Sequence, residues 1–316
     1  MKKVVFCALL GLFAAKMQAQ ESQTGYNFLR LPVSAHAAAL GGDNVSLTED
    51  DGTLMFHNPA LLSGVSDKTL NLNYMSYMQG SKTASASFNR VVKEKASWAV
   101  SAQYVDYGKM KETDEDNNVL GDFSSKDIAI GGYFSYLLAN RLTGGITLKF
   151  ISSYIGSYNS IGVGVDLGLN YFDPKREWSL SFVAKNLGGQ LSAYDEEFDK
   201  MPIDIQMGVS KRVTNTPFRL SATLVNLNDW NYSFLNHAVI GADILLGDNV
   251  WVGGGYNFKR AHDMKIQASS EEKGSSHRAG LTLGGGINLV RFHLNIAYGK
   301  YHVSSSSLIF NVGYSL

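Results

Sequence analysis

The feature that most constrains this chain is a period-two alternation of apolar with small or polar residues, which recurs from residue 68 to the C-terminus. In residues 161–171 the odd positions read Ile, Val, Val, Leu, Leu, Tyr and the even positions read Gly, Gly, Asp, Gly, Asn. Successive side chains of a strand point to opposite faces, whereas a helix would repeat every 3.6 residues. The pattern therefore predicts strands with one apolar face and one small, polar face.

Segments with this alternation are roughly the length that a tilted strand needs to cross a bilayer. Fourteen of them can be counted, at residues 68–78, 82–92, 96–106, 127–137, 140–151, 159–172, 176–187, 202–213, 217–227, 236–246, 249–260, 277–289, 291–301 and 305–316. The number is even, and lipid tolerates no unpaired strand edge, so the sheet must close on itself. We predict an all-β fold, a 14-stranded antiparallel transmembrane β-barrel of the outer membrane over residues 68–316.

The connections between these segments alternate in length. Six of them are short, around residues 93–95, 138–140, 173–175, 214–216, 247–248 and 290, whereas residues 107–126, 188–201 and 261–276 are predicted to form long polar loops. Tight periplasmic turns at one end and longer external loops at the other are typical of an outer-membrane barrel.

The two predicted faces differ in chemistry. Large aromatic residues fall on the face predicted to meet lipid: Trp98, Tyr104, Phe134, Tyr136, Trp178, Phe182, Phe218, Tyr256 and Phe292. Charged residues and histidines fall on the inward face: Lys149, Asp166, Lys185, Asp204, Arg219, His237, Asp243 and His293. An ion-selective pore usually builds a field of one sign, so mixed signs favour internal pairing and contacts with a segment that fills the lumen.

The first nineteen residues read as a secretory signal peptide. Lys2 and Lys3 precede an apolar run over residues 4–15, and Ala19 provides a small residue for cleavage. The only cysteine, Cys7, lies inside the apolar run, which argues against a lipoprotein attachment site. Removal of the signal would leave a slightly acidic chain, which gives no reason to expect nucleic-acid binding.

Residues 20–67 lack the alternation and carry the start and stop signals of short helices instead. Ser34 can cap a helix over residues 35–40 that Gly41 ends, and Asp50 or Asp51 can cap a second turn. Asn58 before Pro59 is a further helix start, with Ala60 inside and a glycine at residue 64 as the stop. We predict that this segment is an N-terminal plug inside the barrel.

Asp50, Asp51 and His57 are the most plausible metal ligands in the chain, because carboxylates and imidazoles bind transition metals. Their spacing matches no strong metal pattern, and an Asp before a helical turn is an ordinary cap, so we favour the structural role. The sequence predicts no metal site and no cofactor.

Catalytic interpretations are weaker still. A hydrolase would need a nucleophile motif, and the scattered histidines accompany no G-x-S-x-G. The glycine runs 253–255 and 284–286 lie inside strand patterns rather than before a helix, so they more plausibly allow curvature or make room for the plug. The acidic residues 112–116 and 195–197 could bind calcium or a basic partner, although solvated loops explain them as well. The sequence predicts no catalytic residue and no enzyme.

One set of residues in the N-terminal region forms a more specific motif: Tyr26, Phe28, Leu29, Leu31 and Pro32, then Gly41 and Gly42, Asp50 and Asp51, and Asn58, Pro59 and Ala60. This motif resembles the PorQ family of outer-membrane components of the Bacteroidota type IX secretion system. Its part from the acidic pair to Asn-Pro-Ala is shared with PorV and the FadL-like barrels.

The resemblance implies a non-enzymatic barrel that docks a surface protein, PorZ in that family, near the PorU–PorV complex, which processes secreted proteins and anchors them. It further implies that the external loops make these contacts, with outer-membrane lipid around the barrel. The alternative is a FadL-like channel for uptake of hydrophobic small molecules, whose lumen should hold a continuous apolar pocket.

Overall fold

The computed structural model describes residues 24–316 except residues 79, 115, 117, 232, 248, 265–277 and 303–304. The predicted signal peptide, residues 1–19, lies outside the described residues, as does most of the predicted loop 261–276.

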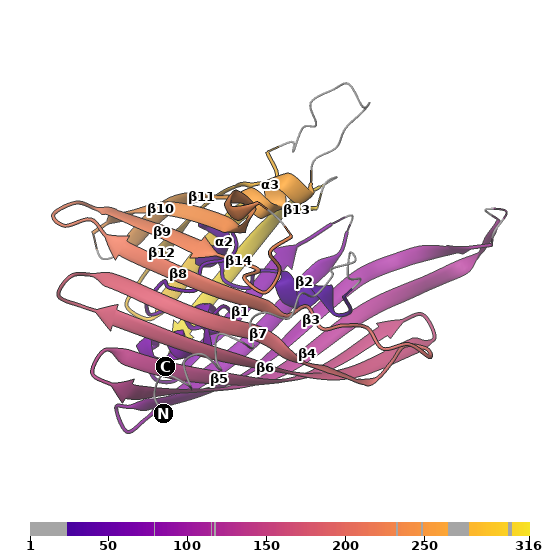
Figure 1. Cartoon of the computed structure of the whole chain (residues 1–316), viewed down its shortest axis with the longest axis horizontal. Helices are drawn as coiled ribbons and strands as arrows, with labels where there is room; N and C mark the ends of the chain where they lie inside the picture. The colour runs from indigo at the N-terminus through magenta and orange to yellow at the C-terminus, as the bar shows by residue number, and fades with distance from the viewer. Residues whose placement is uncertain are drawn as a thin grey trace, which may run out of the picture.

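The described residues form fourteen strands in one closed antiparallel barrel, in which each strand pairs with its sequence neighbours and β1 pairs with β14 (Figure 1). The strands are β1 (Thr69–Ser76), β2 (Lys82–Val92), β3 (Ala96–Thr113), β4 (Val119–Ala139), β5 (Leu142–Ile155), β6 (Tyr158–Asp173), β7 (Trp178–Ser192), β8 (Asp204–Arg212), β9 (Phe218–Leu224), β10 (Ala238–Leu246), β11 (Val250–Asn257), β12 (Leu281–Asn288), β13 (Phe292–His302) and β14 (Ser305–Ser315). The predicted fold class is confirmed.

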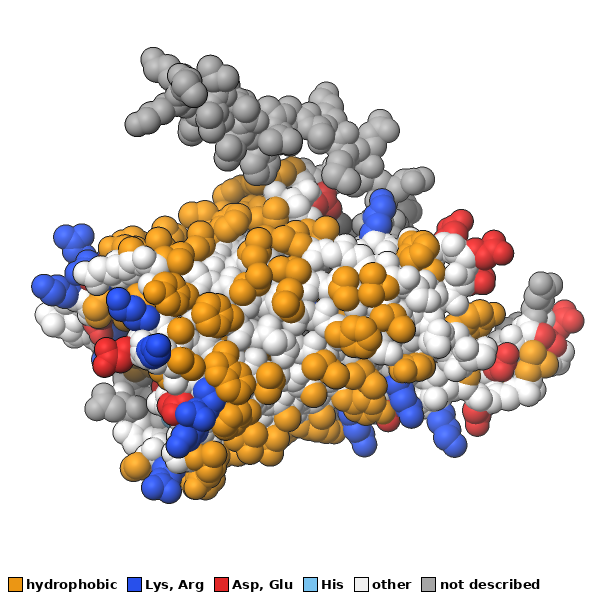
Figure 2. Space-filling model, turned by 90° about the horizontal axis from the view of Figure 1, so that it is seen from below, with side chains coloured by type: hydrophobic (Ala, Val, Ile, Leu, Met, Phe, Trp, Pro, Cys, Tyr) orange, Lys and Arg blue, Asp and Glu red, His pale blue; other side chains and the backbone are white. Residues whose placement is uncertain are grey.

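The two faces of the wall follow the predicted alternation. In β1 the burial of successive residues alternates strictly, with Leu70, Leu72 and Tyr74 exposed and their neighbours buried. Figure 2 shows the result on one side of the barrel, where hydrophobic side chains form a broad band and charged side chains gather at its two ends. Among the predicted lipid-facing aromatics, Trp178 and Tyr256 are half-buried and the other seven are exposed.

The predicted turns join the strands at one end, but one of the predicted long loops is wrong. Most of residues 107–126 belongs to β3 and β4, which continue as a paired hairpin up to Thr113 and Val119. The polar composition of this segment hides strands because both of its faces are outside the bilayer, so no apolar alternation is required. Similarly, β7 runs to Ser192, which shortens the predicted loop 188–201.

Residues 24–67 pass through the lumen from the long-loop end to the short-turn end, and most of their side chains are buried. This segment, the plug, contains η1 (Asn27–Arg30), α2 (Ala35–Ala39), η2 (Gly52–Phe56) and η3 (Pro59–Gly64), of which only α2 is an α-helix (Figure 1, indigo). Two further short elements, η4 (Phe234–His237) and α3 (Phe258–Asp263), lie at the long-loop end. Within the described ranges, no helix combines the length and apolarity required to cross a membrane.

Candidate functional site

The first anchor of the plug to the wall is its entry segment, residues 26–32. Tyr26 has a left-handed backbone (φ 52°), and its hydroxyl lies 2.5 Å from Ser160 Oγ on β6. Phe28 and Leu29 are buried in an apolar cluster with residues of β3, β4 and β5. Of the predicted motif residues in this segment, Tyr26, Phe28, Leu29 and Pro32 are buried and Leu31 is half-buried.

The second anchor is α2 and the glycine pair that ends it. The Ser34 side chain accepts a hydrogen bond from the backbone of Ala37, as the predicted cap requires. Gly41 and Gly42 follow with φ of 107° and 99°, which L-residues rarely adopt. Gly41 N–H donates to Thr282 Oγ1 at 2.9 Å, and a Cβ on Gly41 would lie 2.2 Å from a side-chain methyl of Val239.

The wall glycines make room for this close approach. A Cβ on Gly255 of β11 would lie 2.3 Å from the carbonyl carbon of Leu40, and one on Gly284 of β12 would lie 2.6 Å from Ala39 Cβ. The prediction that glycines in these strands accommodate the plug is confirmed at these two positions.

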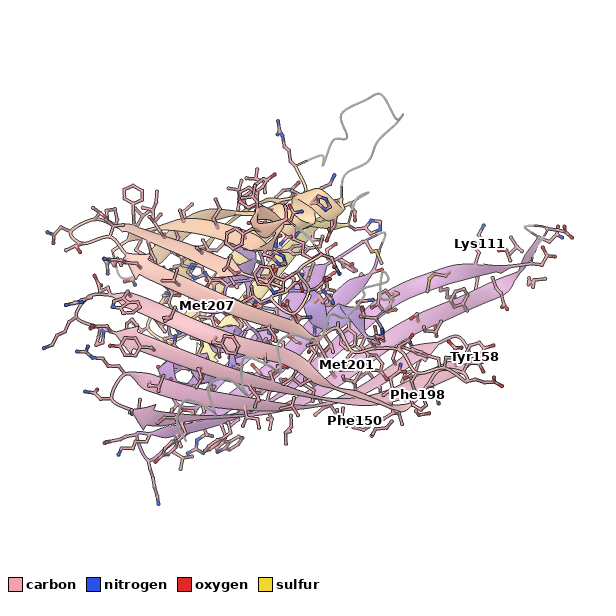
Figure 3. The ribbon with its side chains drawn as sticks, viewed as in Figure 1. Lys111, Phe150, Tyr158, Phe198, Met201 and Met207 are labelled. Carbon is pink, nitrogen blue, oxygen red and sulfur yellow. The ribbon has the colours of Figure 1, made fainter. Side chains whose placement is uncertain are left out.

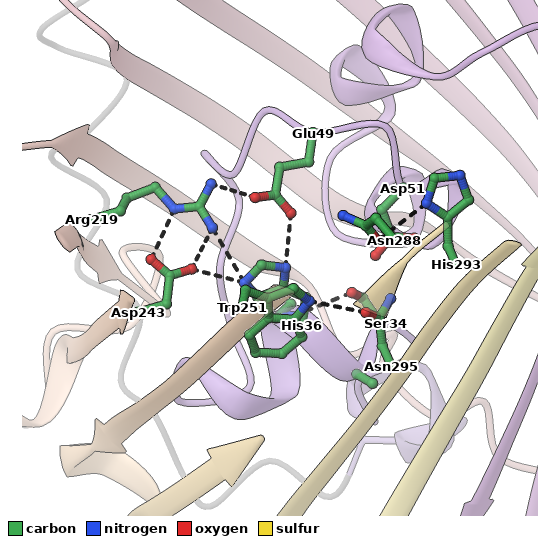
Figure 4. A network of polar contacts seen from close by, with 12 residues as sticks. Ser34, His36, Glu49, Asp51, Arg219, Asp243, Trp251, Asn288, His293 and Asn295 are labelled. Carbon is green, nitrogen blue, oxygen red and sulfur yellow. Dashed lines mark hydrogen bonds and ion pairs between the residues drawn. The ribbon is translucent and has the colours of Figure 1, made fainter. Parts of the chain in front are cut away.

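The third anchor is a network of four charged side chains, of which His36 and Asp243 are buried and Glu49 and Arg219 are partly exposed; it joins two plug residues to two wall residues (Figure 4). The imidazole of His36 lies between two carboxylates, with Nδ1 2.8 Å from Glu49 Oε2 and Nε2 2.8 Å from Asp243 Oδ2. Arg219 of β9 closes the ring, because its guanidinium donates to Asp243 (Nε to Oδ1, 3.0 Å) and to Glu49. Two cations and two carboxylates balance the charge locally.

A ring stack holds His36 in place. Its imidazole lies parallel to the indole of Trp251 on β11, with ring centroids 3.5 Å apart and an interplanar angle of 4°. The Trp251 indole N–H in turn donates to Asn295 Oδ1 at 3.0 Å, which fixes the orientation of the indole. An imidazolium stacked on a tryptophan is a favourable cation–π arrangement.

The environment of the network shifts the ionisation of its two plug members. Burial opposes protonation of His36, but the charge of Glu49 and the hydrogen bonds to Asp243 and Glu49 outweigh it and raise the pKa of His36. Burial likewise opposes ionisation of Glu49, but the charges of Arg219 and His36 hold its pKa well below the ordinary value. Both shifts favour the charged forms, and His36 then donates from both ring nitrogens.

The fourth anchor contains the acidic pair and the Asn-Pro-Ala motif. Asp51 caps η2 by accepting from Thr53 N–H at 2.8 Å, whereas Asp50 is exposed and accepts from Ser66 N–H at 2.7 Å. Asn58 caps η3 by accepting from Ala60 N–H, and its amide donates to Val45 O at 3.0 Å within the plug and to the wall carbonyl of Leu169. Pro59 occupies the first position of η3, and both Pro59 and Ala60 are buried.

His57 does not join the acidic pair. Neither of its ring nitrogens has a hydrogen-bond partner among the described residues, and burial followed by the charge of Lys185 lowers its pKa. It lines a luminal cavity of about 30 Å³ together with Lys149, Lys185 and Tyr133. In the described part of the chain, no three His, Cys, Asp or Glu side chains are grouped so that they could hold a metal ion.

Four of the predicted inward-facing charges form two ion pairs within the wall, Lys149 with Asp166 and Arg219 with Asp243. Lys149 of β5 lies 2.7 Å from Asp166 of β6 and donates to Asn186 Oδ1 at 2.8 Å. Residue-by-residue reasoning from the sequence did not find the roles of His36, Glu49 and Trp251. The one available signal was the presence of Arg219 and Asp243 on the inward face, since such charges require partners from the plug.

Comparisons with known proteins identify the fold. No protein-family model matches the sequence, and no curated protein matches it. Among solved structures, the deltaS2 mutant of the TodX monoaromatic hydrocarbon channel has a TM-score of 0.59 at 15% identity over 90% of this chain and 98% of that one. The CymD monoaromatic hydrocarbon channel has a TM-score of 0.56 at 13% sequence identity, and the match covers 90% of this chain and 97% of that one. A Pseudomonas aeruginosa FadL homologue has a TM-score of 0.55 at 10% sequence identity, with 90% of this chain and 98% of that one covered.

The fold is therefore that of the FadL-like outer-membrane barrels, and the protein resides in the outer membrane. At these identities the likeness concerns the fold alone. The described part of the protein is a 14-stranded barrel with an N-terminal plug fastened to the wall at four places.

Proposed function

We propose that this chain is a non-enzymatic docking component of a type IX secretion attachment complex, which holds a PorZ-like surface protein near a PorU–PorV-like complex. The observation that carries the proposal is the way the lumen is filled. The plug is joined to the wall by the network of His36, Glu49, Arg219 and Asp243, and by hydrogen bonds of Asn58 and Thr282. A barrel filled in this way presents its external end as a rigid platform. The motif over residues 26–60 supports the choice of system.

The size of the luminal cavity supports docking over passage. A cavity of roughly 150 Å³ lined by apolar side chains is needed to hold a single benzene. The cavity beside His57 is about 30 Å³ and is lined in part by lysines, so it fits one or two water molecules. A second cavity of about 180 Å³ lies at the short-turn end, but Glu49, Glu177, Arg212 and Arg219 line it.

The second candidate is a channel for hydrophobic small molecules, and the fold comparisons favour it over docking. The named neighbours are monoaromatic hydrocarbon channels and a FadL homologue, which share the barrel over about nine tenths of the chain. For this chain to work as such a channel, the plug would have to shift and break the buried ion pairs before an apolar molecule could pass.

One experiment separates the two candidates. Full-length tagged protein is purified from its native outer membrane, alongside one variant that lacks residues 109–124 and another that lacks residues 193–201. Docking predicts a surface-protein partner that is lost when an external segment is removed, and a lumen without bound apolar molecules by mass spectrometry. An unchanged set of co-purified proteins, together with a lipid or aromatic compound in the lumen, would contradict docking and support the channel.

A further inference from the structure

The tallest part of the barrel wall is a two-stranded ribbon. Pairing of β3 with β2 ends at Asp106 and pairing of β4 with β5 ends at Ser125, yet β3 and β4 remain paired up to Thr113 and Val119. Residues 107–113 and 119–124 therefore rise past their neighbours, by about 23 Å for seven residues at 3.3 Å each. Figure 1 shows this hairpin projecting beyond every other connection that is drawn as strand.

At the long-loop end of the wall, the inward-facing side chains change from small or polar to apolar. Lower down, inward positions of β4 are small or polar, as at Ser125, Asp127 and Ser135. Above this level the same face carries four apolar side chains, which we call the apolar shelf: Met110, Phe123, Ile155 and Tyr158. The next inward position of β3 beyond Met110 is Glu112, which is opposite Gly121.

The shelf is continuous across four strands. Met110 and Phe123 are cross-strand partners, as are Ile155 and Tyr158. Gly156 lies between the two pairs, because its N–H donates to Ser124 O at 2.9 Å and a Cβ added to it would lie 3.7 Å from Phe123 Cβ. Ile155 and Tyr158 are 40% and 54% exposed, and Met110 and Phe123 are half-buried, so the described chain leaves the shelf partly uncovered.

Lipid does not cover this shelf. The opposite face of the ribbon carries Lys109, Lys111 and Asp122, all of them exposed. A charge on the lipid face of a barrel costs about 2–4 kcal/mol at the bilayer midplane, so these charges place the ribbon above the hydrocarbon. Figure 3 shows Lys111 on the projecting ribbon and Tyr158 at the same end of the wall.

The border of the shelf is acidic. Residues 107–126 contain five acidic and three basic residues, and residues 188–203 contain four acidic residues and one basic residue. Such a border repels the anionic headgroups of an outer leaflet and attracts a basic surface. The shelf is also an open face rather than an enclosed pocket, and an apolar centre with a polar rim is the anatomy of a protein interface.

We propose that the apolar shelf is the docking surface for a protein whose contact face is apolar at its centre and basic at its edge. The inference rests on the docking function proposed above, and it assigns that function to the inner side of the ribbon rather than to the external loops in general. Over residues 109–113 the outer edge of β3 pairs with no strand of the described chain, so a strand of the partner can pair with its backbone groups.

Photo-crosslinking in intact cells tests the proposal, because adjacent strand positions face opposite ways. The full-length protein carries p-benzoylphenylalanine at residue 123 or 158, and matched controls carry it at residue 122 or 111. The shelf positions should give a protease-sensitive adduct with at least tenfold higher yield than the controls. Equal yields from the two faces, adducts that consist of lipopolysaccharide, or no adduct at residues 123 and 158 would overturn the shelf.

A second measurement guards against misfolded variants. The double substitution Phe123→Ser and Tyr158→Ser, without a crosslinker, should reduce co-purification of the protein that the crosslink identified at least tenfold, whereas Lys111→Ser should leave it within twofold. Heat-modifiable migration in gels verifies that each barrel has folded. If crosslinkers at residues 193–201 capture a partner and those at residues 123 and 158 do not, the proposed docking function is supported and the assignment of the contact surface to the shelf is refuted. If no external position captures any protein, the docking function itself fails.

Discussion

Replacing Arg219 with Gln tests whether the buried network holds the plug in place. Arg219 bridges Asp243, whose side chain is 1% exposed, and Glu49, which is 23% exposed. The substitution removes one of the two cations, so two carboxylates share His36 alone. Deleting one partner of a buried ion pair costs about 3–5 kcal/mol, because the remaining charge stays buried.

The size of the effect can be narrowed from the structure. Glu49 is partly exposed and keeps its 2.8 Å contact with His36, so we expect the lower limit, about 3 kcal/mol. Since 1.4 kcal/mol corresponds to a factor of ten, opening of the plug should become more frequent by a factor on the order of 150. Amide hydrogen exchange of plug peptides over residues 34–50, measured by mass spectrometry in bilayer discs, reports this opening directly.

A matched control separates the network from a general loss of charge. Arg212 pairs with Glu177 at 3.3 Å near the same end of the barrel, but both side chains are 40% exposed or more. Exposed pairs contribute 1 kcal/mol or less, so Arg212→Gln should change plug exchange by less than about fivefold. Equal exchange in Arg219→Gln and wild type, with intact strands in both, would refute the argument that this network fastens the plug.

Three further predictions concern the plug. Folding lowers the pKa of Glu49, so its contribution to stability is lost as the pH falls below 4.5, its pKa in the unfolded chain. Folding raises the pKa of His36, so its contribution to stability is complete below pH 6.5, its pKa in the unfolded chain, and is lost as the pH rises through the higher folded pKa. Calorimetry from pH 3 to 9 should therefore find the highest melting temperature between pH 4.5 and 6.5. A melting temperature that only rises or only falls with pH would contradict the role given to the ion pairs of His36 and Glu49. Gly41→Ala should destabilise the barrel by about 2–4 kcal/mol in urea titrations, because backbone strain at positive φ adds to the clash of the new methyl with Val239. The control Gly108→Ala should cost only about 1 kcal/mol, because Gly108 also has a positive φ (78°) but a Cβ there would meet no atom within 4 Å. Asn58→Ala should cost about 1–3 kcal/mol, because it removes the cap of η3 and the amide donor to Val45 O and Leu169 O. Asn58→Asp should cost at least as much, because a buried carboxylate would then face the same two carbonyl oxygens; an Asp variant as stable as wild type would contradict this assignment.

The strand assignments succeeded where burial on one face and lipid on the other forced alternation. Strands such as β6 and β14 lie within a few residues of their predicted bounds for this reason. The same principle explains the error at residues 107–126. Above the bilayer neither face has to be apolar, so the alternation weakens although the backbone pairing continues.

Local caps in the plug were equally readable. Ser34, Asp51 and Asn58 cap the elements that their positions predict, because a side-chain oxygen reaches a backbone N–H two or three residues ahead. Whether each cap starts an α-helix or a 3-10 turn was not readable, since packing against the wall sets the length of such short elements.

The sequence by itself determined the barrel, the two faces of its wall and the short capped turns of the plug, because each depends on neighbours a few residues apart. Only the tertiary structure decided which charges meet. His36 lies against Asp243 and Trp251, more than two hundred residues away, and Glu49 meets Arg219 across the lumen. It also decided that Met110, Phe123, Ile155 and Tyr158 lie on one face at the long-loop end. The register between strands and the path of the plug fix these contacts, and both are global properties of the closed barrel.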